Sequence, residues 1–185
     1  MNRRDALRDI GLLLGMAVTP RVARAVQAGF TAPAVGLPLR VLSSAQAELV
    51  ATIGELIIPT TDTPGARAAR VDAFVDALLA DIFVPEEREQ FLLGLADVDA
   101  RARAAGAASF VASPVPQQVS VLRALEREAA PAGDGPRPIF SWLKELTLVG
   151  YYTSEIGASQ ELRYVHVAGR YDGDVPYEEG DRAYS

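Results

Sequence analysis

The chain has 185 residues, a formal net charge of −6, no cysteine and a single histidine. The lack of cysteine excludes disulfides, thiolate metal sites, c-type haem attachment and cysteine nucleophiles, and a zinc or haem site would need an unusual, carboxylate-rich ligand set. The acidic balance argues against nucleic-acid binding, which requires clustered Lys and Arg to neutralise phosphates.

Residues 1–25 have the three parts of an export leader, which is removed in a mature exported protein. Arg3 and Arg4 begin a basic head, residues 10–18 form an apolar run, and residues 23–25 supply the small residues of a cleavage region. The run is too short to span a bilayer. The sequence therefore predicts a signal peptide over residues 1–25.

The pair Arg3-Arg4, with Leu7 after it, resembles the twin-arginine export signal. Ala6 stands where a bulkier apolar residue is usual. The alternatives are the general secretory route and a basic amphipathic helix of a cytoplasmic protein. The glycines within the apolar run favour the twin-arginine system, whose signals are less hydrophobic and which moves folded proteins.

Residues 26–42 contain glycine and proline without helical periodicity and are predicted to be a linker. Residues 43–185 are predicted to be one helical domain, long enough to bury its own core. Its first helix should begin after Ser43, because Ser43 and Gln46 have the spacing of a capping box, and should end before Pro59.

The loop at residues 59–66 is dense in turn-forming residues, with two prolines and Gly65. Asp62 and the neighbouring threonine hydroxyls could bind a small molecule or a cation. The simpler interpretation, which we favour, is that they cap and tighten a connection between two helices.

A second helix is predicted from the apolar stripe Val71 to Ile82, which recurs at helical spacing. Asp72, Asp76 and Asp81 lie off that stripe. They could be a metal or acid/base set, but a solvated acidic face explains them more simply.

Two further helices are predicted downstream. Pro85 begins the third, which ends near Gly106, and the fourth runs from Val115 to about Ala130. The charged side of the fourth helix is most simply a solvated surface. Residues 131–138 are predicted to be an exposed loop because they are rich in glycine and proline.

The fifth helix begins near Ile139 and is the most apolar, so it should be buried centrally. Core packing is the default for Trp142, but aromatic residues are also enriched at interfaces. Tyr151 and Tyr152 point about 100° apart, so that one can pack while the other presents its hydroxyl. The segment holds our candidate interface residues, Trp142, Tyr151, Tyr152, Thr153 and Glu155.

The tail from Ala158 to Ser185 shows no helical period and is predicted to be irregular. It contains His166, which we interpret as a surface or interface histidine because no nucleophile or orienting partner is evident for a general base. We find no G-x-S-x-G, H-E-x-x-H or glycine-rich phosphate motif in the sequence.

Several stretches together resemble the gluconate 2-dehydrogenase subunit 3 family. They are the first helix from Ser43, the loop at 58–66, the helix around Phe74-Val75-Asp76 and the run at 146–155. The resemblance covers most of the chain after the leader. It implies a small, non-catalytic subunit of a membrane-associated bacterial dehydrogenase, with a twin-arginine signal.

The resemblance also implies the partners and their cofactors. A large flavoprotein of the glucose-methanol-choline type would hold FAD and oxidise a sugar or polyol, and a cytochrome c subunit, where present, would carry haem c. The twin-arginine translocase would move the small and large subunits together into the periplasm. No catalytic, cofactor-binding or metal-binding residue carries over to this chain. Some family members use a cysteine to bridge to the large subunit, which this chain cannot do.

Two other functions compete with this one. A free-standing periplasmic enzyme would need carboxylates such as Asp62 and Glu155 to converge in a pocket with perturbed pKa values. A periplasmic helical binding module would need a sizeable apolar pocket and no flavoprotein partner.

Overall fold

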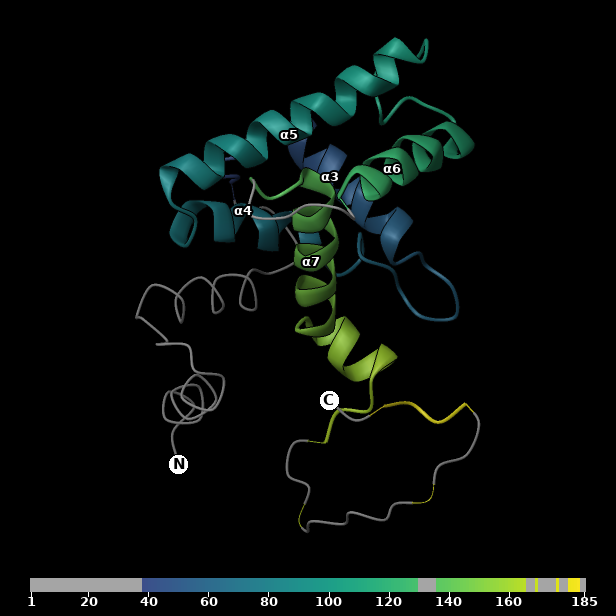
Figure 1. The fold of residues 1–185 in the computed structure, drawn as a ribbon. Helices are drawn as coiled ribbons and strands as arrows, with labels where there is room; N and C mark the ends of the chain where they lie inside the picture. The colour runs from purple at the N-terminus through teal and green to yellow at the C-terminus, as the bar shows by residue number, and fades with distance from the viewer. Residues whose placement is uncertain (1–37, 130–135, 166–168, 170–175, 177–179, 184–185) are drawn as a thin grey trace.

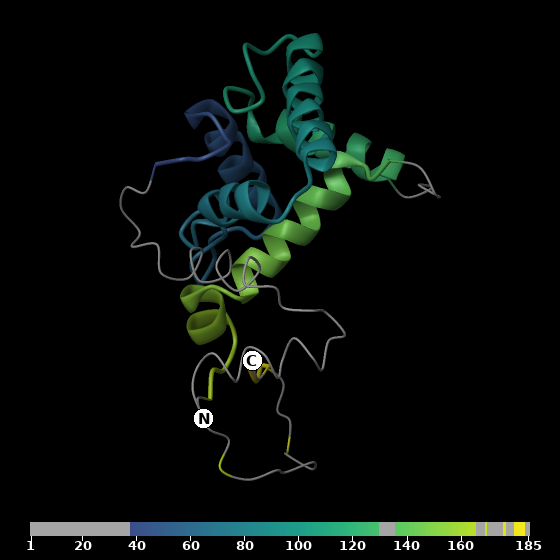
Figure 2. The ribbon, with the colours of Figure 1, turned by 90° about the vertical axis from the view of Figure 1, so that its left-hand side faces the viewer.

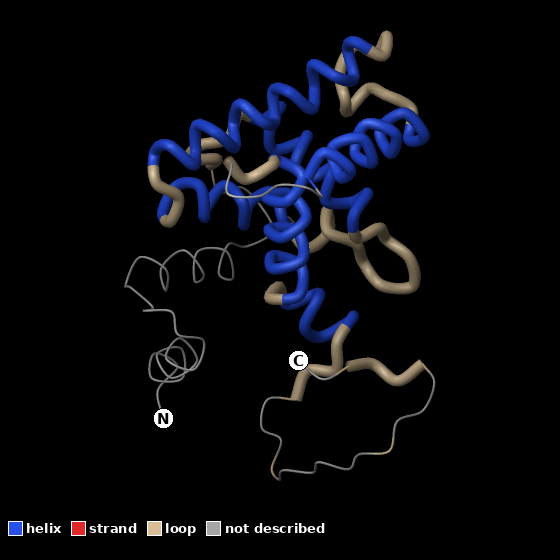
Figure 3. The backbone as a smooth tube through the Cα atoms, in the orientation of Figure 1, coloured by secondary structure: helices blue, strands red, loops and turns tan. Residues whose placement is uncertain are grey.

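The computed structural model describes residues 38–129, 136–165, 169, 176 and 180–183 (Figure 1). These residues form helices and no strand (Figure 3). The elements are α3 (Ser44–Ile57), α4 (Val71–Asp81), α5 (Pro85–Ala104), α6 (Val115–Ala129), α7 (Ile139–Tyr152) and the π-helical turn η1 (Gly157–Glu161). The predicted all-α domain with five helices is confirmed. The predicted leader, with Arg3, Arg4 and Leu7, lies outside the described residues, as does His166.

The ends of the helices follow the local signals in the sequence. The Ser43 hydroxyl accepts a hydrogen bond from the backbone N–H of Gln46 at 3.3 Å, and the Gln46 side chain accepts one from the N–H of Ser43 at 2.9 Å. This pair is the predicted capping box. Helix α3 then ends at Ile57, two residues before Pro59. Gly106, with φ of +90°, turns the chain just after α5.

Helix α7 is the element around which the others pack. It contacts α3, α4, α5 and α6 and leads into η1, and Figures 1 and 2 show it passing beneath them toward the C-terminal segment. The close approach depends on two glycines. A Cβ at Gly94 of α5 would lie 2.6 Å from Cβ of Ile139, and one at Gly150 would lie 2.6 Å from Cδ1 of Phe74 on α4.

The core lies on the inner side of α7. Buried apolar side chains from every helix meet there, including Ile53, Leu79, Phe91, Leu122 and Leu143. The outer side of α7 is exposed, and not all of it is polar. The prediction that this helix is central is confirmed, but its apolar residues are not all buried.

The predicted solvated acidic face of α4 is wrong for Asp76. Its side chain is buried, with the residue 4% exposed. Its carboxylate accepts hydrogen bonds from the backbone N–H groups of Arg40, Val41 and Leu42 at 2.8–2.9 Å. These three residues belong to the end of the predicted linker, which therefore packs on the domain. The interpretation as a solvated face was wrong because the partners of Asp76 come from 34 to 36 residues earlier in the chain.

The start of the predicted irregular tail is also different in the structure. Ala158 to Glu161 belong to η1, which follows α7 directly. A Cβ at Gly157 would lie 2.0 Å from the carbonyl oxygen of Tyr151, so only glycine fits where the chain turns against the end of α7. The Ser154 hydroxyl stabilises this turn, because it donates to Tyr151 O and accepts from Gly157 N.

Candidate partner-binding surface

The connection between α3 and α4 is held against the end of α3 by Glu55. One oxygen of its carboxylate accepts hydrogen bonds from the backbone N–H and the hydroxyl of Thr60, at 2.8 and 2.7 Å. The other accepts from the N–H of Arg67 at 3.1 Å. Burial raises the pKa of Glu55, but the hydrogen bonds from Thr60 and Arg67 lower it more, so that the net pKa lies below the usual value.

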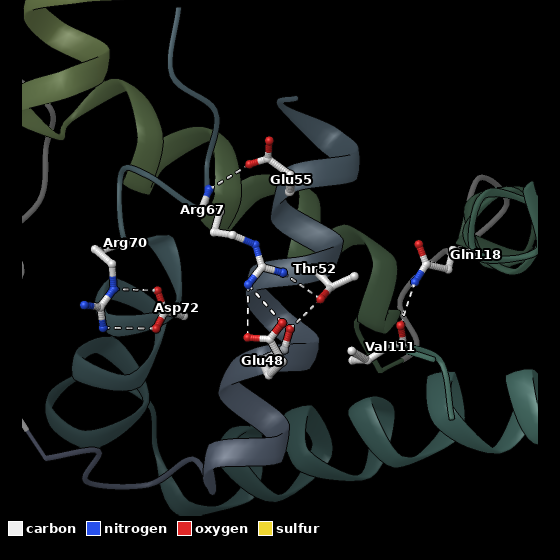
Figure 4. A network of polar contacts seen from close by, with 8 residues as sticks. All are labelled: Glu48, Thr52, Glu55, Arg67, Arg70, Asp72, Val111 and Gln118. Atoms are coloured by element: carbon white, nitrogen blue, oxygen red, sulfur yellow. Dashed lines mark hydrogen bonds and ion pairs between the residues drawn. The ribbon is translucent and has the colours of Figure 1, made fainter. Parts of the chain in front are cut away.

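Arg67 extends this attachment along the outside of α3 (Figure 4). Its guanidinium donates to Glu48 at 2.9 Å and to the Thr52 hydroxyl at 2.9 Å. Glu48, Thr52 and Glu55 lie on one side of the helix, each about one turn from the next. The Arg67–Glu48 ion pair is exposed and contributes little energy by itself. Its effect is to hold the end of the loop that precedes α4 against the side of α3.

The loop's own polar side chains are used inside the fold. The Thr61 hydroxyl donates to Asp62, which lowers the pKa of Asp62. The buried Thr63 hydroxyl donates to Glu161 of η1 at 2.5 Å. Across the described part of the chain, no three acidic or histidine residues are grouped so as to hold a metal ion. These contacts favour the capping interpretation of the loop over a ligand site.

The tyrosine pair at the end of α7 divides as its spacing predicts. Tyr151 is 1% exposed and donates its hydroxyl hydrogen bond to Pro64 O at 2.8 Å, which ties the loop to α7. Burial raises the pKa of Tyr151. Tyr152 is 40% exposed, and its ring packs edge-on against Tyr151 with 5.3 Å between ring centroids. Of the two, Tyr152 is therefore the one available to a partner.

Tyr152 belongs to an exposed, partly apolar surface on the outer side of α7. We call it the α7 surface, and it consists of Leu148, Val149, Tyr152, Thr153 and Glu155. Leu148 and Tyr152 are one helical turn apart, and Val149 lies beside them. Within the described part of the chain, the Glu155 carboxylate forms no hydrogen bond or ion pair. Three exposed apolar side chains close together on one helix are suited to contact with another protein.

Trp142 does not lie on the α7 surface. It precedes Tyr152 by ten residues, or about 15 Å along the helix. Its half-buried ring packs against Phe83, with 4.6 Å between centroids, and Arg137 lies over it at 4.1 Å. Its buried indole N–H has no hydrogen-bond acceptor among the described residues. The structure thus separates the predicted interface residues into two places, at opposite ends of α7.

A groove of about 420 Å³ between α3 and α5 has no counterpart in the sequence-based expectations. Leu49, Leu95 and Val111 give it an apolar lining, and Asp99 and Arg103 also line it. The volume is within the range of small-molecule sites. However, Asp99 already binds Arg103 and the N–H of Phe110, so its polar groups are engaged within the fold. No local sequence pattern reveals the groove, because its lining comes from three separate segments.

Comparison with known proteins identifies a family. The family model described as gluconate 2-dehydrogenase subunit 3 matches residues 44–169, which include every described helix. No curated protein and no solved structure matches the chain. Among the described residues, none of the helices has the length and apolar character needed to cross a membrane.

The role of Glu55 predicts a pH-dependent contribution to stability. Because its folded-state pKa is lowered, the stabilisation is present above the unfolded-state pKa of about 4.3 and is lost as the pH falls through the folded value. We therefore expect Glu55→Gln to lower the free energy of unfolding most at pH 7, and the difference from wild type to shrink below about pH 4. Urea unfolding between pH 3 and pH 7 measures this difference.

Glu89→Gln is the control, because Glu89 is exposed on α5. It should change the free energy of unfolding little at any of these pH values. A Glu55→Gln difference that is the same at pH 7 and pH 3 would contradict the assigned role of the carboxylate.

Proposed function

The chain belongs to the gluconate 2-dehydrogenase subunit 3 family, and we propose that it is the non-catalytic small subunit of a membrane-associated, FAD-dependent dehydrogenase. The family's description identifies its members as subunits of a dehydrogenase complex. The partner's substrate class would be gluconate, glucose or a related polyol. The observation that carries the proposal is the family match over residues 44–169, which spans the whole described helical core.

The division of labour places the redox chemistry in the partners. FAD would be held by a large flavoprotein of the glucose-methanol-choline type, and haem c by a cytochrome subunit where the complex has one. The part played by this chain is to bind and stabilise the flavoprotein. The loop at 59–66 supports such a role, because contacts with the helices hold it in place: the Thr60 and Thr63 hydroxyls donate to carboxylates of α3 and η1, and the Pro64 carbonyl accepts from α7.

The proposed docking site is the α7 surface. Tyr152 is its aromatic anchor, and Leu148 and Val149 extend the apolar area. Aromatic anchors in apolar surroundings contribute most of the binding energy at typical interfaces. Because the chain has no cysteine, the association must be noncovalent. Residues 1–25 would carry the complex through the twin-arginine translocase to the periplasm, where it associates with the membrane through its other subunits.

The groove between α3 and α5 favours one second candidate, a periplasmic binding module for a small apolar molecule. That function requires no flavoprotein. The two are distinguished by whether a large flavin-containing chain accompanies the protein when it is isolated from its host.

The export proposal predicts that the protein remains in the cytoplasm when both Arg3 and Arg4 are replaced by lysine. The receptor would recognise the planar guanidinium groups and not charge alone, so lysine is not an adequate substitute. Cell fractionation and immunoblotting of this chain and of the flavoprotein measure the outcome, and we expect both to be absent from the periplasm. Normal periplasmic recovery of both proteins would refute the twin-arginine assignment.

The docking proposal predicts that Tyr152→Ala weakens the complex at least ten-fold, or about 1.4 kcal/mol. Binding of the purified flavoprotein to the immobilised variant measures the loss. Glu126→Ala is the matched control, since Glu126 is exposed on α6. Trp142→Ala is tested beside it, to show whether the aromatic residue at the other end of α7 contributes. Equal losses for Tyr152→Ala and Glu126→Ala would count against the α7 surface.

A further inference from the structure

Four successive backbone N–H groups at the start of the described chain are bound by side chains. Those of Arg40, Val41 and Leu42 donate to Asp76, and that of Ser43 donates to Gln46. A run of backbone outside any helix or sheet normally gives these hydrogen bonds to water. Here a single buried carboxylate on α4 takes three of them.

A second acidic residue of α4 holds the same segment from outside. The Arg40 guanidinium forms two hydrogen bonds with the Asp81 carboxylate, at 2.7 and 2.5 Å. Asp81 is the last residue of α4, where the helix dipole is unfavourable for an anion and favourable for a cation such as Arg40. This pair is partly exposed, so it should contribute less than Asp76 does.

We propose that residues 38–42 form a strap that is attached only when α4 is folded in place, and that can open while the helices remain packed. Its attachment requires Asp76 and Asp81 together on one folded helix, one turn and a half apart. Opening would expose Leu42, which belongs to the core, and the half-buried Leu39 and Val41, which pack against it, but it would separate none of the helices from one another. A segment outside the helices can open locally at a free energy below that of global unfolding.

The position of the strap gives it a consequence for export. The strap connects the domain to residues 1–37, which include the segment that export would use. It would be attached in a folded chain and free in an unfolded one. This consequence rests on the proposed function. The strap itself does not depend on the proposed function, because it is defined by contacts within the described residues.

The test is limited trypsin digestion of the full chain, with hydrogen exchange of the strap amides followed by mass spectrometry. Trypsin cleaves after Arg40 only when the strap is open, and after Arg123 only when α6 unfolds. We expect Asp76→Asn to increase cleavage after Arg40 at least ten-fold and to accelerate exchange at residues 40–42. Cleavage after Arg123 should stay within two-fold of wild type. Glu89→Gln, at an exposed position of α5, should change neither site.

Asp81→Asn provides a milder variant in case Asp76→Asn does not fold. It removes the carboxylate that binds the Arg40 guanidinium and leaves Asp76 in place, so we expect a several-fold increase in cleavage after Arg40 and none after Arg123. The proposal is overturned if neither variant speeds exchange at residues 40–42, or if cleavage after Arg40 and Arg123 rises by the same factor.

These outcomes are separate from the proposed function, because digestion uses this chain without a partner. If the strap responds as expected but the chain is not exported, the proposal that the strap exists is supported and its consequence for export is refuted. Strap amides that do not respond would overturn the strap and leave the subunit assignment untouched.

Discussion

Burial of one side of α7 is the constraint on which the rest of the structure depends. Four helices pack on that side, and α4 and α5 come close to it because Gly150 and Gly94 carry no side chain. The same packing buries Tyr151, whose hydroxyl reaches back to Pro64 and fixes the loop between α3 and α4. What remains exposed at this end of the molecule is the α7 surface. The candidate binding surface is thus a direct result of how the core is filled.

The polar residues that could suggest chemistry serve the architecture. The Glu55 carboxylate accepts hydrogen bonds from the backbone of Thr60 and Arg67, and that of Asp76 accepts them from the backbone before α3. Both carboxylates act on backbone that has no partner in a helix or sheet. An accessory subunit needs a rigid shape to present to its partner, and these contacts supply that rigidity. These contacts are compatible with the proposed binding role, which rests on the family match over residues 44–169.

The sequence was a good guide wherever the physics is local. Capping by Ser43 and Gln46, the stop before Pro59 and the turn at Gly106 each involve residues a few positions apart, and the structure confirms them. The buried role of Asp76 could not be predicted, since an aspartate off the apolar stripe of a helix is usually solvated. Its partners are remote in sequence. The same limit applies to the groove between α3 and α5, and to the separation of Trp142 from the α7 surface.

The most direct test of the central claim is isolation of the C-terminally tagged protein from the membranes and periplasm of its own host. Mass spectrometry would identify the chains that accompany it, and an absorbance spectrum would detect bound flavin. If the chain is a dehydrogenase subunit, a large chain should co-purify with it, with flavin absorbance close to one equivalent. A colourless protein that is recovered alone would contradict the assignment as a dehydrogenase subunit.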